Sequence, residues 1–440
     1  TTINAGTADI TLDQAASTFG ALALTGANVA VTENAATDLS ASTVSGTLGV
    51  TSTGAVTDSG TLAITGATTI SASGQDITLD EAASTFGALA LTGANVAVTE
   101  NAATDLAAST VSGTLGITSA GAVTDSGTLA ITGATTISAS GQDITLDEAA
   151  STFGTLALTG SNVAVTENAA MDLGASTIGG TANFNSTSNV ITDSGTLAIT
   201  GATTINAGTA DITLDQAAST FGALALTGAN VAVTENAATD LAASTVSGTL
   251  GVTSTGAVTD SGTLAITGGT TISASGQDIT LDEAASTFGT LALTGANVAV
   301  TENAATDLGA STVGGTLGIT STGAVTDSGT LAITGATTIS ASGQDITLDE
   351  AASTFGTLAL TGSNVAVTEN AAMDLGASTV SGTFGITAGG AITDSGTQTI
   401  TGAATFTNTA GTNDAITLDD LSNAFSGTVT FSTDSGSAVT

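Results

Sequence analysis

The chain has 440 residues and a formal net charge of −38, with no Lys, Arg, His, Cys, Pro, Trp or Tyr. The lack of cysteine excludes disulfides, iron–sulfur clusters and thiolate zinc sites. The negative charge argues against nucleic acid and anionic membrane surfaces as partners, because both are themselves negative.

One stretch recurs along the whole chain. At residues 76–87 it reads Asp-Ile-Thr-Leu-Asp-Glu-Ala-Ala-Ser-Thr-Phe-Gly. Such a fixed period indicates near-identical units that stack into one body. We therefore expect residues 1–440 to form one continuous repeat domain, with no separate globular domain. The leading isoleucines, which recur at an almost constant interval, are Ile10, Ile77, Ile144, Ile212, Ile279, Ile346 and Ile416.

Each repeat divides into three similar thirds. Every third opens with a short apolar strand, followed by an acidic residue, a polar turn and a second alternating strand. The acidic landmarks Asp80, Glu100 and Asp125 mark the three thirds of one repeat, and Asp147 opens the next repeat. This spacing predicts about three coils in each repeat, each of roughly 22 residues.

The local pattern has period two, as in Leu89-Ala-Leu91 and Leu129-Ala-Ile131. Such alternation is typical of half-buried strands. Short strands at coil spacing predict an all-β fold, a single parallel β-solenoid of roughly twenty coils. Glycines are expected at the corners. The phenylalanines at positions equivalent to Phe86 are expected to stack in the core.

Two places depart from the regular pattern. Residues 181–190 carry one extra residue and are interpreted as a bulged corner. The end, from about Gln398, drifts further and is interpreted as either a cap or a more diverged repeat. The two ends of the sequence show no polar capping domain. Because bare solenoid ends present unpaired strand edges, we expect the native chain to continue or the rods to join end to end.

Four segments near the end of the sequence are characteristic. They are Asp-Leu-Gly-Ala-Ser-Thr-Val at 374–380, Ala-Gly-Gly-Ala-Ile-Thr-Asp-Ser-Gly at 388–396, Thr-Ile-Thr-Gly-Ala-Ala-Thr-Phe at 399–406 and Asn-Asp-Ala-Ile-Thr-Leu-Asp at 413–419. They resemble the tandem β-strand repeats of large bacterial exoproteins, the filamentous haemagglutinin-like class of secreted adhesins. The resemblance covers essentially the whole chain, and it implies a right-handed parallel β-helix displayed on the cell surface.

The acidic residues form repeating columns with no basic residue to pair with them. If Asp80, Glu100 and Asp125 follow equivalent strands, they share one edge about 5 Å apart along the axis. One hypothesis is a ladder of Ca²⁺ sites along this edge, since carboxylate oxygens suit Ca²⁺. The alternative is a solvated acidic edge that keeps the rods soluble. The candidate calcium ligands are Asp80, Glu100, Asp125, Asp147, Glu167 and Asp193.

Paired carboxylates could also serve glycoside hydrolysis, but every carboxylate recurs in several copies, and no Arg, Lys, His or Tyr is present to assist. We therefore expect no enzyme. Threonine ladders suggest an ice-binding surface as a weaker alternative, with Thr78, Thr99 and Thr124 on one face and Thr92, Thr118 and Thr132 on another.

The sequence thus favours a structural, self-associating filament or matrix fibre at the cell surface or outside the cell. Its contacts would be homotypic, either end to end or lateral. The alternative is the stalk of a large secreted adhesin, whose binding tip lies outside this segment and meets a host or environmental surface. An ice-binding or ion-binding surface is the third interpretation.

Overall fold

The computed structural model describes residues 1–409, 414–433 and 438–440. The chain is an all-β parallel solenoid of about 21 turns, with no helix in its described parts, which confirms the predicted fold class. None of these residues forms a helix long and apolar enough to cross a membrane. The internal contacts divide the chain into two units, Thr1–Gly222 and Ala223–Thr440, and each is described by itself. One continuous domain stays a prediction.

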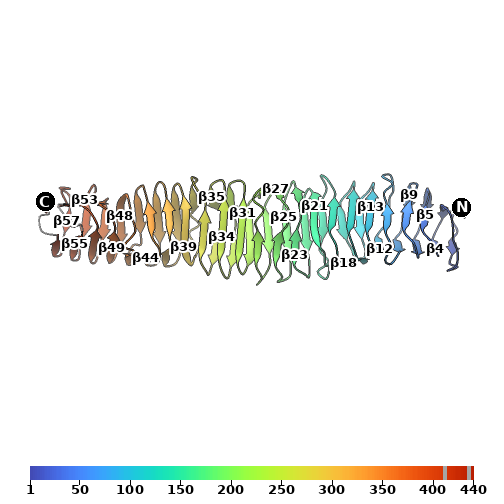
Figure 1. Ribbon diagram of the computed structural model, residues 1–440, viewed down its shortest axis with the longest axis horizontal. Coiled ribbons are helices and arrows are strands. Elements are labelled where there is room, and N and C mark those ends of the chain that lie inside the picture. Colours follow the sequence, from blue (N-terminus) through green and yellow to red (C-terminus); the bar gives the residue numbers. More distant parts are fainter. Residues whose placement is uncertain (410–413, 434–437) are drawn as a thin grey trace. The chain divides into compact units, whose positions relative to one another are not determined.

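The second repeat of unit 1 shows the arrangement of strands that the other repeats share. Its strands pair in parallel with those of neighbouring coils. In Figure 1, strands of successive coils lie side by side, such as the paired β31 (Val231–Glu235) and β34 (Leu250–Ser254) of unit 2. The strands of the second repeat and its borders are β10 (Thr68–Ser71), β11 (Ile77–Leu79), β12 (Leu89–Gly93), β13 (Val96–Glu100), β14 (Thr104–Leu106), β15 (Ser109–Val111), β16 (Leu115–Ser119), β17 (Val123–Asp125), β18 (Leu129–Ile131), β19 (Thr135–Ser138) and β20 (Ile144–Leu146).

The core is built by the inward-facing side chains of these strands. In β13, Val96 and Val98 are buried and Ala97 between them is exposed, as period-two alternation requires. Val96 is the ladder partner of Leu115, and Val98 of Ile117, so apolar side chains stack from coil to coil. The stacked layers replace the large aromatic core that this composition cannot supply.

A coil of this repeat has one long side and two short sides. The long side is the ladder β13–β16–β19. The short sides are the ladders β14–β17–β20 and β15–β18. At the border with the preceding coil, the long strand β12 is covered by the two short strands β14 and β15, whereas short β11 is covered by long β13. Long and short sides therefore exchange once in every repeat.

This exchange rotates consecutive repeats by half a turn. The strand β2 (Ile10–Leu12) and β20 open the first and third repeats and belong to one sheet, whereas β11 opens the second repeat in another. Each repeat therefore winds three and a half coils. Seven ladder steps lead from Ile10 to the strand of Ile144, through Val29, Leu48, Thr68, Leu89, Leu106 and Asp125.

Glycines lie at the corners, as predicted. Gly74 has a φ of 73°, in the left-handed region that favours glycine. Gly133 has an ordinary φ, but a Cβ there would lie 2.6 Å from the Gly113 carbonyl oxygen of the neighbouring coil. The first glycine is required by its backbone conformation and the second by the close approach of two coils.

The phenylalanines equivalent to Phe86 line the core, as predicted. Phe86 is 8% exposed, and its equivalents are buried or, for Phe19, half-buried. The prediction that they stack on one another is wrong, because equivalent positions of consecutive repeats lie half a turn and several coils apart. The extra residue in the third repeat produces a bulged turn after β25 (Ala182–Asn185), where Thr187 and Ser188 have φ values of 45° and 75°.

Candidate functional site

The recurring stretch forms a loop that is held at both ends by carboxylates from neighbouring coils. After β11 the chain leaves the ladder, and Asp58, the last residue of β8 (Val56–Asp58), accepts hydrogen bonds there. Its Oδ1 accepts from the Asp80 N–H at 2.8 Å, and its Oδ2 from the Glu81 N–H at 3.4 Å. At the far end, the Phe86 N–H donates to Oε1 of Glu100 at 2.8 Å. Since β8 and β13 flank β11, the two carboxylates reach the loop from opposite sides.

We call this arrangement the loop clamp: an aspartate accepts hydrogen bonds at the start of the loop and a glutamate accepts one at its end. The loop clamp recurs along both units. Each aspartate accepts two backbone N–H groups of the loop, at 2.8 and 3.4 Å, and the glutamates accept the phenylalanine N–H at 2.6–2.8 Å. The further aspartates with this role are Asp125, Asp193, Asp260 and Asp327, and the further glutamates are Glu33, Glu167, Glu302 and Glu369.

These carboxylates point inward because of strand parity. Glu100 follows Val96 and Val98 at intervals of two residues, so it faces the core and is 2% exposed. Asp125 follows Val123 in the same way and is 9% exposed. An acidic residue placed on the inner face loses its hydration and requires backbone donors.

The glutamates are only partly satisfied. Oε1 of each accepts the phenylalanine N–H, whereas Oε2 of Glu100, Glu302 and Glu369 is buried without a hydrogen-bond partner of normal geometry. Burial raises the pKa of Glu100 and Glu302, and the Phe86 and Phe288 N–H groups offset part of this rise.

One neighbouring residue distinguishes two classes of glutamate. Thr306 lies beside Glu302 and its hydroxyl also lowers the pKa of Glu302, although the two side chains miss the geometry of a hydrogen bond. The residue equivalent to Thr306 is Met373 beside Glu369. There burial raises the pKa of Glu369 to about 7, opposed only by the Phe355 N–H. The pair Glu167 and Met171 repeats this environment, and the pKa of Glu167 is also raised to about 7 by burial.

The aspartates of the clamp are perturbed as well. Burial raises the pKa of Asp125, and the Asp147 and Glu148 N–H groups lower it. The negative charges of the Asp147 and Glu148 side chains raise it again. Each aspartate is therefore an acceptor for the loop backbone and, at the same time, lies close to the loop's own carboxylates.

The structure brings together only part of the predicted acidic edge. Asp125 lies beside Asp147, and Asp193 has the same relation to Asp215. Glu100 is instead the ladder partner of Ser119, and Asp125 that of Leu106, so Glu100 and Asp125 lie on different ladders. Glu167 is 0% exposed, whereas Asp80 and Asp147 are exposed on the loop. The prediction that Asp80, Glu100 and Asp125 share one edge is therefore wrong, because the acidic spacing differs from the ladder step.

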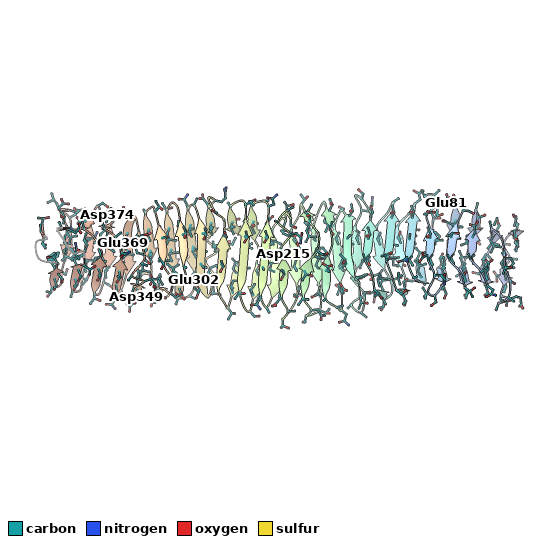
Figure 2. All side chains as sticks on the ribbon, viewed as in Figure 1. Glu81, Asp215, Glu302, Asp349, Glu369 and Asp374 are labelled. Atoms are coloured by element: carbon teal, nitrogen blue, oxygen red, sulfur yellow. The ribbon has the colours of Figure 1, made fainter. Side chains whose placement is uncertain are left out.

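The role of these residues in calcium binding stays a prediction. Across residues 1–409, 414–433 and 438–440, no group of three or more acidic side chains is placed to hold one metal ion. The same residues enclose no pocket. In Figure 2 the side chains of Glu302 and Glu369 are labelled on the ribbon of unit 2, together with Asp349 and Asp374.

The predicted threonine ladders also need correction. Thr99 is the ladder partner of Thr118, which was predicted to lie on another face, and Thr92 is the ladder partner of Thr110.

Two signals in the sequence could have located the loop clamp. The alternation Val96, Val98, Glu100 places the glutamate inside. Glutamate occupies this position in each of the first six repeats, whereas Glu81 is replaced by glutamine in two of them, at Gln14 and Gln216.

Comparison with known families gives one match. A family described as repeats of unknown function matches six consecutive segments, residues 26–92, 93–159, 160–227, 228–294, 295–361 and 362–432. Neither curated proteins nor solved structures gave a match.

Proposed function

The chain belongs to this family of repeats of unknown function, and from that premise we propose that it serves as a structural filament or matrix fibre outside the cell. The observation that carries the proposal is the repetition itself. Each coil is a template for the next through parallel ladders, and successive repeats present the same loop clamp. Such an arrangement supports extension of a body rather than one distinct site.

The composition supports a location at the cell surface. A chain without Lys or Arg offers no cleavage site to trypsin-like proteases, and a chain without Cys is indifferent to the redox state of its surroundings. The acidic surface favours solubility of individual chains. A structural filament also requires self-association, and we propose homotypic contacts, either lateral or end to end.

The second candidate is the stalk of a large secreted adhesin, related to the filamentous haemagglutinin-like class. It is favoured by the amino-acid sequence of the repeats at residues 374–380 and 388–396. In this function the repeats are a spacer and the binding tip lies elsewhere. Stalk and filament differ in one property, since only the filament polymerises.

Sedimentation velocity and negative-stain electron microscopy over a wide range of protein concentrations test the proposal. The filament function predicts assemblies that grow with concentration, with regular lateral or axial contacts. A chain that remains monomeric at every concentration would contradict the filament and favour the stalk. Salt should strengthen the assembly, because it screens repulsion between acidic chains.

A further inference from the structure

The sites of Glu302 and Glu369 in unit 2 differ in their polar neighbours. In both, the phenylalanine N–H donates to Oε1, at 2.8 Å for Phe288 and 2.7 Å for Phe355, and Oε2 is buried. Glu302 has Thr306 beside it and Ser321 as its ladder partner. At the equivalent positions Glu369 has Met373 and Ala388. The Ser321 hydroxyl donates to the Ala304 carbonyl, so the Thr306 hydroxyl is the one that lowers the pKa of Glu302. Glu369 has lost this hydroxyl.

The charged groups around Glu369 cannot compensate it either. The loop that leads to Phe355 carries Asp349 and Glu350, and β50 (Met373–Leu375) carries Asp374. Asp374 accepts hydrogen bonds from the hydroxyls of Thr357 and Ser395. The strands β47 (Ile346–Leu348), β49 (Val365–Glu369) and β52 (Phe384–Ala388) carry no charged side chain other than Glu369. All these neighbours are acidic, and the chain has no Lys, Arg or His.

A buried carboxylate with one unpartnered oxygen is costly, whereas the neutral acid keeps the Phe355 hydrogen bond and removes the charge. We propose that Glu369 and its equivalent Glu167 are proton-binding sites of the folded solenoid, which take up a proton on folding and release it on unfolding, so that acidification stabilises the fold.

The direction of the effect follows from linkage. Burial raises the pKa of Glu369 in the folded chain from 4.5 to about 7. Between these two values the folded chain binds a proton that the unfolded chain does not, so stability increases as the pH falls through this window. The contribution is fully present below pH 4.5 and is lost as the pH rises through about 7.

The composition allows a direct test. Because the chain has no His or Cys, carboxylates with raised pKa values and the α-amino group are the only groups left to titrate between pH 6 and 8. We would titrate the full chain potentiometrically, folded and in urea. The folded chain should bind about two more protons than the unfolded chain near pH 6, one at each methionine-flanked glutamate.

Matched variants assign the protons. The double variant E167Q/E369Q should lose the extra uptake. The variant M171T/M373T, which introduces a residue already present beside Glu302, should shift the uptake to lower pH. The control D143N/D345N removes two exposed carboxylates from the same repeats and should leave the uptake unchanged. Coincident folded and unfolded curves between pH 6 and 8, or extra uptake that persists in E167Q/E369Q, would overturn the proposal. If the glutamine variant fails to fold, M171T/M373T alone decides.

Discussion

At the scale of residues, the main finding is that acidic side chains serve as acceptors for loop N–H groups at the margin of an apolar core. Glu100 accepts the Phe86 N–H, and Phe86 itself is 8% exposed. A buried N–H without an acceptor is unfavourable, so the glutamate compensates for the loop's departure from the ladder. The same residue brings a desolvated charge into the fold, and the two effects oppose each other.

A pair of substitutions separates the two effects. In Glu100→Ala the Phe86 N–H loses its acceptor, and we expect the free energy of unfolding to fall by about 1–3 kcal/mol. Glu100→Gln keeps an oxygen acceptor and removes the charge, so it should be less destabilising than alanine at pH 8. Equilibrium urea unfolding measures both. An equal loss in the two variants would mean that the hydrogen bond contributes nothing.

The environment of Glu369, which has Met373 where Glu302 has Thr306, leads to a prediction for the variant Thr306→Met: its stability should depend more strongly on pH than that of the wild type. Placing Met at the equivalent position, Thr306→Met, removes the hydroxyl that lowers the pKa of Glu302. The pKa of Glu302 in the folded chain should rise further, and the variant should gain more stability than the wild type when the pH falls from 8 to 5. Thermal unfolding midpoints followed by circular dichroism at both pH values measure this gain. A parallel shift of both proteins would contradict it.

At the scale of elements, the coils approach each other most closely at their corners. A Cβ at Gly133 would lie 2.6 Å from the backbone oxygen of Gly113. In the middle of a long strand, a Cβ at Gly116 would meet nothing nearer than the Val96 oxygen at 3.8 Å. Both residues are glycines in one repeat, but only the first is required by the spacing of the coils.

These two glycines give a matched prediction. Gly133→Ala forces two backbones apart and should cost about 1–3 kcal/mol. Gly116→Ala adds a methyl group on an open strand surface and should change stability by less than about 1 kcal/mol. Urea unfolding of the two single variants provides the comparison. A similar loss in both would show that the corner spacing does not limit the fold.

The strands and their repeat could be predicted from the sequence, whereas the ladder partners of individual residues could not. Alternation and the regular repeat led to the parallel solenoid. The positions of the acidic landmarks suggested one shared edge, yet the ladder step varies and is shorter from Leu89 to Leu106 than from Thr68 to Leu89. Register follows the exchange of long and short sides, which is a property of packing between coils. The inward position of Glu100 was nevertheless available from strand parity.

At the scale of the molecule, three and a half coils per repeat give the surface a two-repeat period. In unit 1, the exposed Thr69 and Thr136 are equivalent positions of consecutive repeats on different sheets, β10 and β19. Thr204, one repeat further in β28 (Thr203–Asn206), returns to the sheet of Thr69. Within unit 1, a surface feature of one repeat is therefore presented again on the opposite side by the next, which suits a filament with lateral contacts on two sides.

The half-turn can be measured directly because the chain has no Cys. Spin labels would be attached to two double variants, T69C/T136C and T69C/T204C, and the distances determined by pulsed electron paramagnetic resonance. Seven coils separate the second pair, so its distance should be roughly 34 Å along one side. The labels of the first pair lie on opposite sides of the solenoid and half of this axial distance apart. The distance between them should therefore clearly exceed half that of the second pair. A first distance equal to half the second would place every repeat on the same side and contradict the half-turn.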